Sequence, residues 1–294
     1  MPHTHQTAFA SFWISAALVL SAFVYVRGWV HIRRLDLDTI EIWRSASFLF
    51  GVLFIWLAMA SPIAALDSEL LTIHMVKHLL LMTVASPLIW LGAPIEPLFH
   101  GLPQKAGQVA VSMFFRSEPM QRLGRFLGHP AVCWLAASGT LIGWHIPVLF
   151  MLGMHSTMWH EVEQLSFLAG GLLFWWPVVE PGSTSSRMPE LAILLYLFLA
   201  TLPCDILSGF LVFCGRVVYP MYFLSPRLGL SVLGDQEYAG ALMWTWVTVV
   251  YLIAGTFFTA RLLLPESSRH YAVVRPGMQH SNETQTTQDG LEVI

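Results

Sequence analysis

The sequence predicts an all-α membrane protein, a polytopic bundle of about seven transmembrane helices. Its 294 residues are 55% hydrophobic and only 11% charged, against about 25% charged in soluble domains, and the mean hydropathy is +0.62. Apolar segments of about 20 residues, long enough to cross a bilayer, recur through to about residue 264. Because the formal net charge is −3 and no basic face is indicated, we expect membrane lipid and no nucleic acid among its partners.

The first two predicted spans run from Ala8 to Val30 and from Ser45 to Pro62. The leading residues MPHTHQTA contain no Lys or Arg, unlike the basic start of a signal peptide, so we expect the first span to be retained. A third span follows in HMVKHLLLMTVASPLIWLGAP. We expect Asp67 or Ser68 to N-cap this helix, and we expect the helix to end near Gly92-Ala93-Pro94.

Residues 95–130 interleave basic with apolar residues, which predicts an amphipathic segment on the membrane surface. Four further spans are predicted at Ala131 to Leu152, Thr157 to Val179, Pro189 to Cys214 and Tyr238 to Leu264. We therefore expect one transmembrane domain over residues 1–264, the surface segment included, and a polar, disordered cytoplasmic tail over residues 265–294.

The distribution of Lys and Arg predicts the orientation of the bundle. With seven spans and the N-terminus outside, twelve of the 15 Lys and Arg residues belong to the cytoplasmic connections, the C-terminal tail or the adjoining span ends. The outer side is left with three, which are Lys77, Arg216 and Arg227. The N-terminus is therefore predicted outside and the C-terminus in the cytoplasm.

Two histidines, His74 and His78, are spaced i and i+4 in the third span, so both imidazoles share one helix face. Ionisable side chains inside a membrane span are costly and by default mark a functional site. Two histidines at this spacing also offer two nitrogen ligands to one metal ion. The alternative is that each ring only hydrogen-bonds a neighbouring helix. For a pair we favour the functional role.

The predicted orientation brings His145, His155 and His160 to the same outer third of the bundle. Methionines flank these histidines, and although methionine in a membrane helix is more often packing, thioether with imidazole suits Cu(I). The predicted metal ligands are His74, His78, His145 and His160. The candidate auxiliary ligands are Met75, Met154, Met158 and His155.

Three carboxyl residues are candidates for support of the ligands or for a relay. Glu163 shares a helix face with His160 at i,i+3 and can orient its imidazole. Asp205 falls in mid-span, where an unpaired carboxylate is costly, so we expect either a structural hydrogen bond or a relay and favour the hydrogen bond. Asp235 opens the seventh span, where an N-cap is a sufficient role.

These motifs occur in the same order in a known family. The chain resembles the multi-span CtaG-type cytochrome c oxidase assembly factors over about residues 40–264. The matching stretches are HMVKHLLLMTVASPLIWLGAP, Trp144-His145-Ile146-Pro147, His160 leading to FLAGGLLFWWPVV, Pro203-x-Asp205-x-x-x-Gly209, and Asp235-Gln236 with Gly240 and Trp244. The resemblance implies a seven-span protein of the bacterial cytoplasmic membrane that matures an aa3- or caa-type haem-copper oxidase, with copper delivery as its expected role.

The positions carried over by this resemblance are His74, His78, His145, His160, Asp205 and Asp235. Where the family often has a second histidine, four residues after the first at the start of span five, this chain has Gln164. Gln is a poor copper ligand, so His155 and Met154 are the candidates to replace that histidine.

The sequence thus predicts a non-enzymatic assembly factor for a haem-copper cytochrome c oxidase, binding copper as Cu(I). Two alternatives stay open. A membrane haem electron carrier would need axial histidines on different helices, such as His78 and His145. A copper or proton transporter would use Cys204 and Asp205 as its relay, although no repeated half supports it. No Ser/His/Asp order or HExxH motif indicates a hydrolase.

Overall fold

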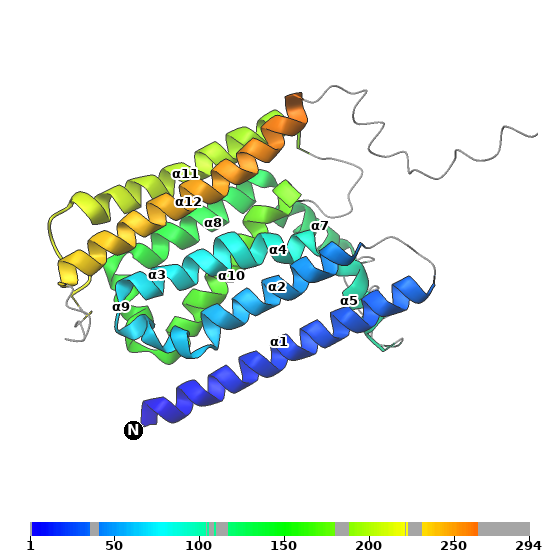
Figure 1. Cartoon of the computed structure of the whole chain (residues 1–294), viewed down its shortest axis with the longest axis horizontal. Coiled ribbons are helices and arrows are strands. Elements are labelled where there is room, and N and C mark those ends of the chain that lie inside the picture. The colour runs from blue at the N-terminus through cyan, green and yellow to red at the C-terminus, as the bar shows by residue number, and fades with distance from the viewer. Residues whose placement is uncertain are drawn as a thin grey trace, which may run out of the picture.

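The computed structural model describes residues 2–35, 41–103, 105, 109, 117–179, 188–220, 222 and 231–263, whose regular elements are helices with no strand (Figure 1). In chain order the helices are α1 (Pro2–Arg34), α2 (Ile42–Met59), η1 (Pro62–Ser68), α3 (Leu71–Leu79), η2 (Leu80–Ala85), α4 (Ser86–Leu91), α5 (Ile95–Gly101), α7 (Glu118–Leu127), α8 (Pro130–His145), α9 (Pro147–His155), α10 (Thr157–Val179), α11 (Glu190–Phe213) and α12 (Val232–Leu263).

Six helical segments of the described chain are long and apolar enough to cross a membrane. They are Ser11–Arg34 within α1, then α2, the continuous run from α3 through η2 to α4, and α10, α11 and α12. Helices α7 and α8 make a seventh candidate span, although the chain bends by 68° between them. The predicted all-α bundle of about seven spans is confirmed. The side of the membrane on which each terminus lies stays a prediction.

The predicted tail and surface segment lie wholly or partly outside the described residues. The expected tail over residues 265–294 lies outside the described residues, and so does much of the segment 104–116. Helix α7, at the end of the predicted surface segment, contains no buried residue and carries an exposed Glu118–Arg122 ion pair. Such an exposed, polar helix is suited to the membrane surface.

Several predicted helix ends differ from the structure, and the seventh span begins at Val232 instead of Tyr238. Span four does not run on to Leu152, because α8 ends at His145 and α9 begins at Pro147. A residue before proline is disfavoured in the helical region, and Ile146 is accordingly extended, with φ −67° and ψ 124°. Neither Asp67 nor Ser68 N-caps the third span, since both belong to η1 and α3 starts after Leu70.

Helix α10 lies at the centre of the bundle, in contact with α3, η2, α4, α8 and α9 (Figure 1). Helices α11 and α12 run side by side on one flank, and α12 also packs along α3. Helix α1 lies on the opposite flank, beside α2 and α5. The segments that meet around α3 and α10 are therefore the ones that carry the predicted metal ligands.

The third span is not a uniform α-helix, because η2 is a π-helical turn that begins two residues after His78. The wider turn is stabilised by side chains: Ser86 Oγ donates to the Leu81 carbonyl at 2.7 Å, and Trp175 Nε1 donates to the Met82 carbonyl at 3.0 Å. At Gly171 an added Cβ would lie 2.7 Å from Met82 Cα, so only glycine lets α10 approach this closely. Such π-helical turns often occur at functional sites.

Candidate metal centre

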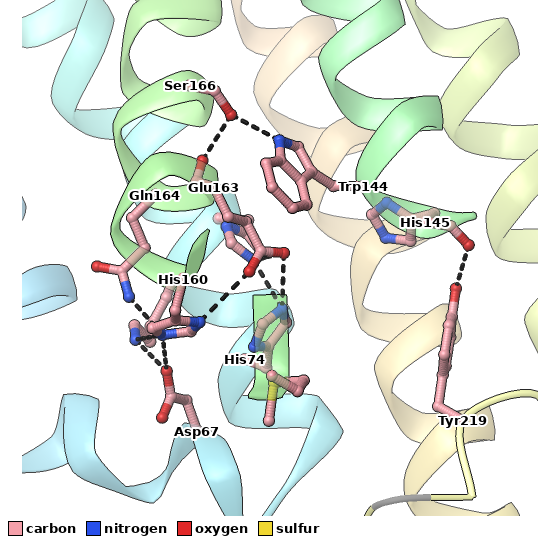
Figure 2. Close-up of polar contacts among 12 residues, drawn as sticks. Asp67, His74, Trp144, His145, His160, Glu163, Gln164, Ser166 and Tyr219 are labelled. Carbon is pink, nitrogen blue, oxygen red and sulfur yellow. Dashed lines mark hydrogen bonds and ion pairs between the residues drawn. The ribbon is translucent and has the colours of Figure 1, made fainter. Parts of the chain in front are cut away.

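His74 and His78 meet a carboxylate from α10. Their Nε2 atoms lie 2.8 Å apart, and both are buried, with His74 only 1% exposed. Glu163 Oε1 lies 3.3 Å from His74 Nε2 and 3.4 Å from His78 Nε2 (Figure 2). The carboxylate is itself 1% exposed, so three potential ligand atoms converge in a site closed to solvent.

His160 joins Glu163 to a second carboxylate. Its Nδ1 lies 3.3 Å from Glu163 Oε2, and its Nε2 lies 2.8 Å from Asp67 Oδ2 (Figure 2). Because each ring nitrogen faces a carboxylate oxygen, a protonated imidazole that donates to both fits this position better than a metal ligand does. Gln164 Nε2 lies 2.6 Å from His160 Nε2, which gives that glutamine a contact within the same network.

Lys77 completes the charge balance around Asp67. The lysine is 5% exposed, forms an ion pair with Asp67, and has its Nζ 3.4 Å from His160 Nε2. Burial alone would raise the pKa of the Asp67 carboxyl, but the hydrogen bond from His160 and the charge of Lys77 outweigh burial and hold this pKa well below its ordinary value. Asp67 therefore stays ionised at neutral pH.

The six residues Asp67, His74, Lys77, His78, His160 and Glu163 form what we call the histidine–carboxylate cluster. Asp67 and Lys77 were not among the predicted site residues. A signal was present, because a lysine between two histidines in a membrane span requires a partner, and Asp67 is the acidic residue ten positions before it.

Two triads in this cluster hold ligand atoms that all lie within 4.8 Å of one another, namely His74 with His78 and Glu163, and His74 with Asp67 and His160. The first triad fits a metal ion better. A tetrahedral site with bonds of about 2.0–2.1 Å has ligand-to-ligand edges of roughly 3.3 Å. Two of its three edges, at 3.3 and 3.4 Å, match that value. Glu163 is thus suited to direct ligation as well as to orienting His160.

His145 lies apart from this cluster, on α8 (Figure 2). Its Nδ1 donates to the Leu141 carbonyl at 2.7 Å, which leaves the lone pair of a neutral ring on Nε2. That Nε2 atom is buried and has no hydrogen-bond partner among the described residues. His145 lines a cavity of about 30 Å³ together with His78, while its carbonyl accepts a hydrogen bond from Tyr219 at 2.7 Å.

The predicted auxiliary ligands differ in burial and in what they contact. Met75 is buried and lines the same cavity as His145. Met154 is half-buried, with its Sδ 3.7 Å from the Tyr222 hydroxyl. Met158 is 61% exposed, and His155 is exposed with its Nδ1 hydrogen-bonded to a carbonyl of its own helix. The structure therefore places Met158 and His155 at exposed positions and gives Met154 a contact with Tyr222.

Asp235 caps a helix, but it is α3 rather than its own. Its carboxylate accepts from the backbone N–H groups of Leu71 and Thr72 at 2.7 and 3.2 Å, and from Thr72 Oγ1 at 2.6 Å. These are the groups that the first turn of α3 leaves unpaired, and a carboxylate there also complements the helix dipole. Asp235 thus positions the helix that carries His74 and His78.

Asp205 contacts neither the cluster nor His145. It lines a groove between α11 and α12 with Thr201, Thr248 and Tyr251. Its Oδ1 atom is buried and has no hydrogen-bond partner in the part of the chain that the structure describes. The structural hydrogen bond expected from the sequence is therefore not found for this oxygen.

The fold and the buried ligands define the class as a polytopic helical membrane protein with a candidate metal centre near one end of its bundle. Residues 23–263 match the model of the cytochrome c oxidase caa3 assembly factor family (Caa3_CtaG), and the chain belongs to this family. The resemblance drawn from the sequence motifs is thereby confirmed.

Similar proteins occur in mycobacteria. An uncharacterised protein of Mycobacterium leprae is 24% identical over 237 residues, which cover 79% of this chain and 36% of the relative. An uncharacterised protein of Mycobacterium tuberculosis is 25% identical over 242 residues, with the same two coverages. The chain thus spans about a third of the length of these relatives. No solved structure matches the chain.

Proposed function

We propose that this protein is a non-enzymatic assembly factor that binds copper at the histidine–carboxylate cluster and assists its delivery to the subunits of a haem-copper cytochrome c oxidase. Membership of the assembly factor family supports the role in oxidase maturation. The observation that carries the copper proposal is the convergence of His74, His78 and Glu163, three buried ligands within reach of one ion.

The donor atoms at this cluster support a divalent ion. Two imidazole nitrogens and one carboxylate oxygen suit Cu²⁺ or Zn²⁺, and among the common divalent first-row ions a given site generally binds Cu²⁺ most tightly. The negative charge of Glu163 also compensates a divalent ion better than a neutral thioether would. We therefore propose Cu²⁺ at this cluster, in place of the Cu(I) suggested by the flanking methionines.

We also propose that the protein resides in the cytoplasmic membrane of a bacterium with its N-terminus outside. The twelve-to-three division of Lys and Arg supports this orientation. In that orientation α3 begins at the outer surface, so the cluster lies within reach of metal supplied from outside the cell.

Copper binding by the full-length protein in detergent tests the proposal. The variants Glu163→Gln and His74→Ala/His78→Ala should each lower the affinity for Cu²⁺ by at least about 10–100-fold. His155→Ala is the matched control, because this histidine is exposed and lies outside the cluster. Binding should weaken in acid, since only the neutral imidazole is a ligand. Copper stoichiometry and affinity unchanged in the double alanine variant would contradict the proposal.

Neither alternative function gains support from the geometry. A haem between His78 and His145 would need far more room than the cavity of about 30 Å³ that they share, because pockets for such ligands measure about 300–1,000 Å³. A relay through Asp205 lacks a continuation, since Asp205 faces a groove between α11 and α12 and not the cluster. A purified sample with a Soret band would restore the haem hypothesis.

A further inference from the structure

A second set of donor atoms surrounds the cavity next to the cluster. This cavity of about 30 Å³ is lined from α3, η2, α8, α10, α11 and α12, so it lies inside the bundle. A buried space of roughly 10–15 Å³ already holds one water molecule, so there is room for an ion with little or no water. We call it the sulfur-lined cavity, after Met75, Met82, Cys204 and Met243 in its wall.

The nitrogen donors of this cavity are His145 and His78. The lone pair of His145 Nε2 is free for a ligand, because Nδ1 donates to a backbone carbonyl and Nε2 has no partner among the described residues. His145 is only 6% exposed, and a buried polar atom of this kind usually has a partner. His78 also lines the cavity, and its Nδ1 is buried and without a partner in the described part of the chain.

The charge of the cavity separates it from the cluster. Among the residues described around it there is no Asp, Glu, Lys or Arg. Without a carboxylate to compensate it, a divalent ion would be costly to bury there, whereas a monovalent soft ion is far less so. Imidazole, thioether and thiol donors are the set that suits Cu(I). Methionine has three rotatable bonds, so the thioethers of Met75 and Met82 can move to close on an ion.

We propose that the sulfur-lined cavity is a second metal site, specific for Cu(I), in which His145 Nε2 and sulfur atoms of Met82 and Cys204 are the principal ligands. This inference rests on the proposed copper function and adds to it a second site and an oxidation state. Cu(I) binds here as supplied, and no redox step is part of the proposal. The protein therefore separates two forms of copper by donor chemistry, Cu²⁺ at the cluster and Cu(I) in the cavity.

The test adds Cu(I) without oxygen to the full-length protein in detergent, in competition with a chromophoric Cu(I) chelator. Met82→Leu/Cys204→Ser and His145→Gln should each lower the Cu(I) affinity by at least about tenfold and leave Cu²⁺ binding unchanged. Glu163→Gln should lower the Cu²⁺ affinity and leave Cu(I) binding unchanged. The matched controls are Met158→Leu, at an exposed methionine, and Cys133→Ser, at a buried cysteine that does not line the cavity; neither should change the affinity for either ion.

X-ray absorption of the Cu(I) form supplies a second measurement, and it should detect sulfur neighbours that disappear in Met82→Leu/Cys204→Ser. Three outcomes would overturn the cavity site: no Cu(I) binding by wild type, no sulfur neighbours of bound Cu(I), or unchanged Cu(I) affinity in both cavity variants. If Cu²⁺ binding persists in any of these cases, the proposed function at the cluster stands alone. If the wild-type protein binds neither Cu²⁺ nor Cu(I), both proposals are contradicted.

Discussion

The two halves of the third span lie in chemically different surroundings. Near its start, His74 and His78 meet Glu163, and Lys77 meets Asp67, so ionised groups compensate one another at close range. Further along, Met82 and the π-helical turn face a cavity whose described lining contains no ionised residue. The comparison indicates that charge is confined to the part of the span where opposite charges are buried together. The start of the span therefore lies against carboxylates of other segments, whereas Met82 lies in a cavity lined by further sulfur atoms.

The largest expected effect comes from breaking the charge balance of the first half. Asp67→Asn leaves Lys77 buried without its carboxylate, and such a loss typically costs about 3–5 kcal/mol. Thermal unfolding in detergent should register this loss, and Asp67→Asn/Lys77→Met should recover most of it because both charges are then gone. A double variant no more stable than the single one would show that the ion pair is not what Asp67 contributes.

This difference between wild type and Asp67→Asn also has a predicted pH dependence. The folded pKa of Asp67 is depressed, so its stabilisation is complete above the unfolded value of about 3.9 and is lost as the pH falls through the folded value. The stability gap should therefore be constant between about pH 5 and pH 6, where the carboxyl of Asp67 is ionised and the His160 of the unfolded chain is still protonated. A gap that closes within that range would contradict the ionised state of Asp67.

An intermediate effect is expected where α10 packs on the π-helical turn of the second half. In Gly171→Ala the new Cβ would lie 2.5 Å from Ser86 Oγ and 2.7 Å from Met82 Cα, so α10 must move away. Overpacking of this kind costs about 1–3 kcal/mol, measured as a lower unfolding temperature. Gly139→Ala is the matched control, because no atom lies within 4 Å of its added Cβ. Equal effects of the two variants would contradict this account of the contact.

The smallest effect is expected at Asp205, a carboxyl group outside both halves of the comparison. Asp205→Asn should change stability by less than about 0.5 kcal/mol, since the buried Oδ1 atom has no hydrogen bond to lose within the described part of the chain. Asp205→Leu should likewise leave the abundance of the protein unchanged. Normal abundance of Asp205→Asn together with a copper-deficient oxidase would instead indicate a relay role.

Much of the fold was predictable because hydrophobic length determines a span directly. The predicted fifth span, Thr157 to Val179, coincides with α10, and the sixth differs from α11 by one residue at each end. The fourth was predicted too long because its apolar character continues past Pro147, where only the backbone restriction before proline ends the helix. Hydrophobic composition alone does not contain that backbone restriction.

The candidate site was predictable in depth but not in rotation about the helix axes. Sequence spacing gave the shared face of His74 and His78, which the structure reproduces with Nε2 atoms 2.8 Å apart. It also put His145 and His160 at the same depth. Because α8 and α10 are rotated differently about their axes, His145 faces the cavity and His160 contacts Asp67. Met158 and His155 lie at a suitable depth but on exposed faces. Rotation depends on contacts between distant segments, which spacing along one helix does not contain.

The cap that Asp235 provides for α3 has a consequence for the order in which the protein is made. The carboxylate that pairs with Leu71 N–H stands 164 positions later in the chain. Because a chain is synthesised from its N-terminus, the third span enters the membrane with its first-turn N–H groups still unpaired. They are paired with Asp235 only once α12 lies beside α3. The helix that carries His74 and His78 is therefore completed by a segment made more than a hundred residues after it.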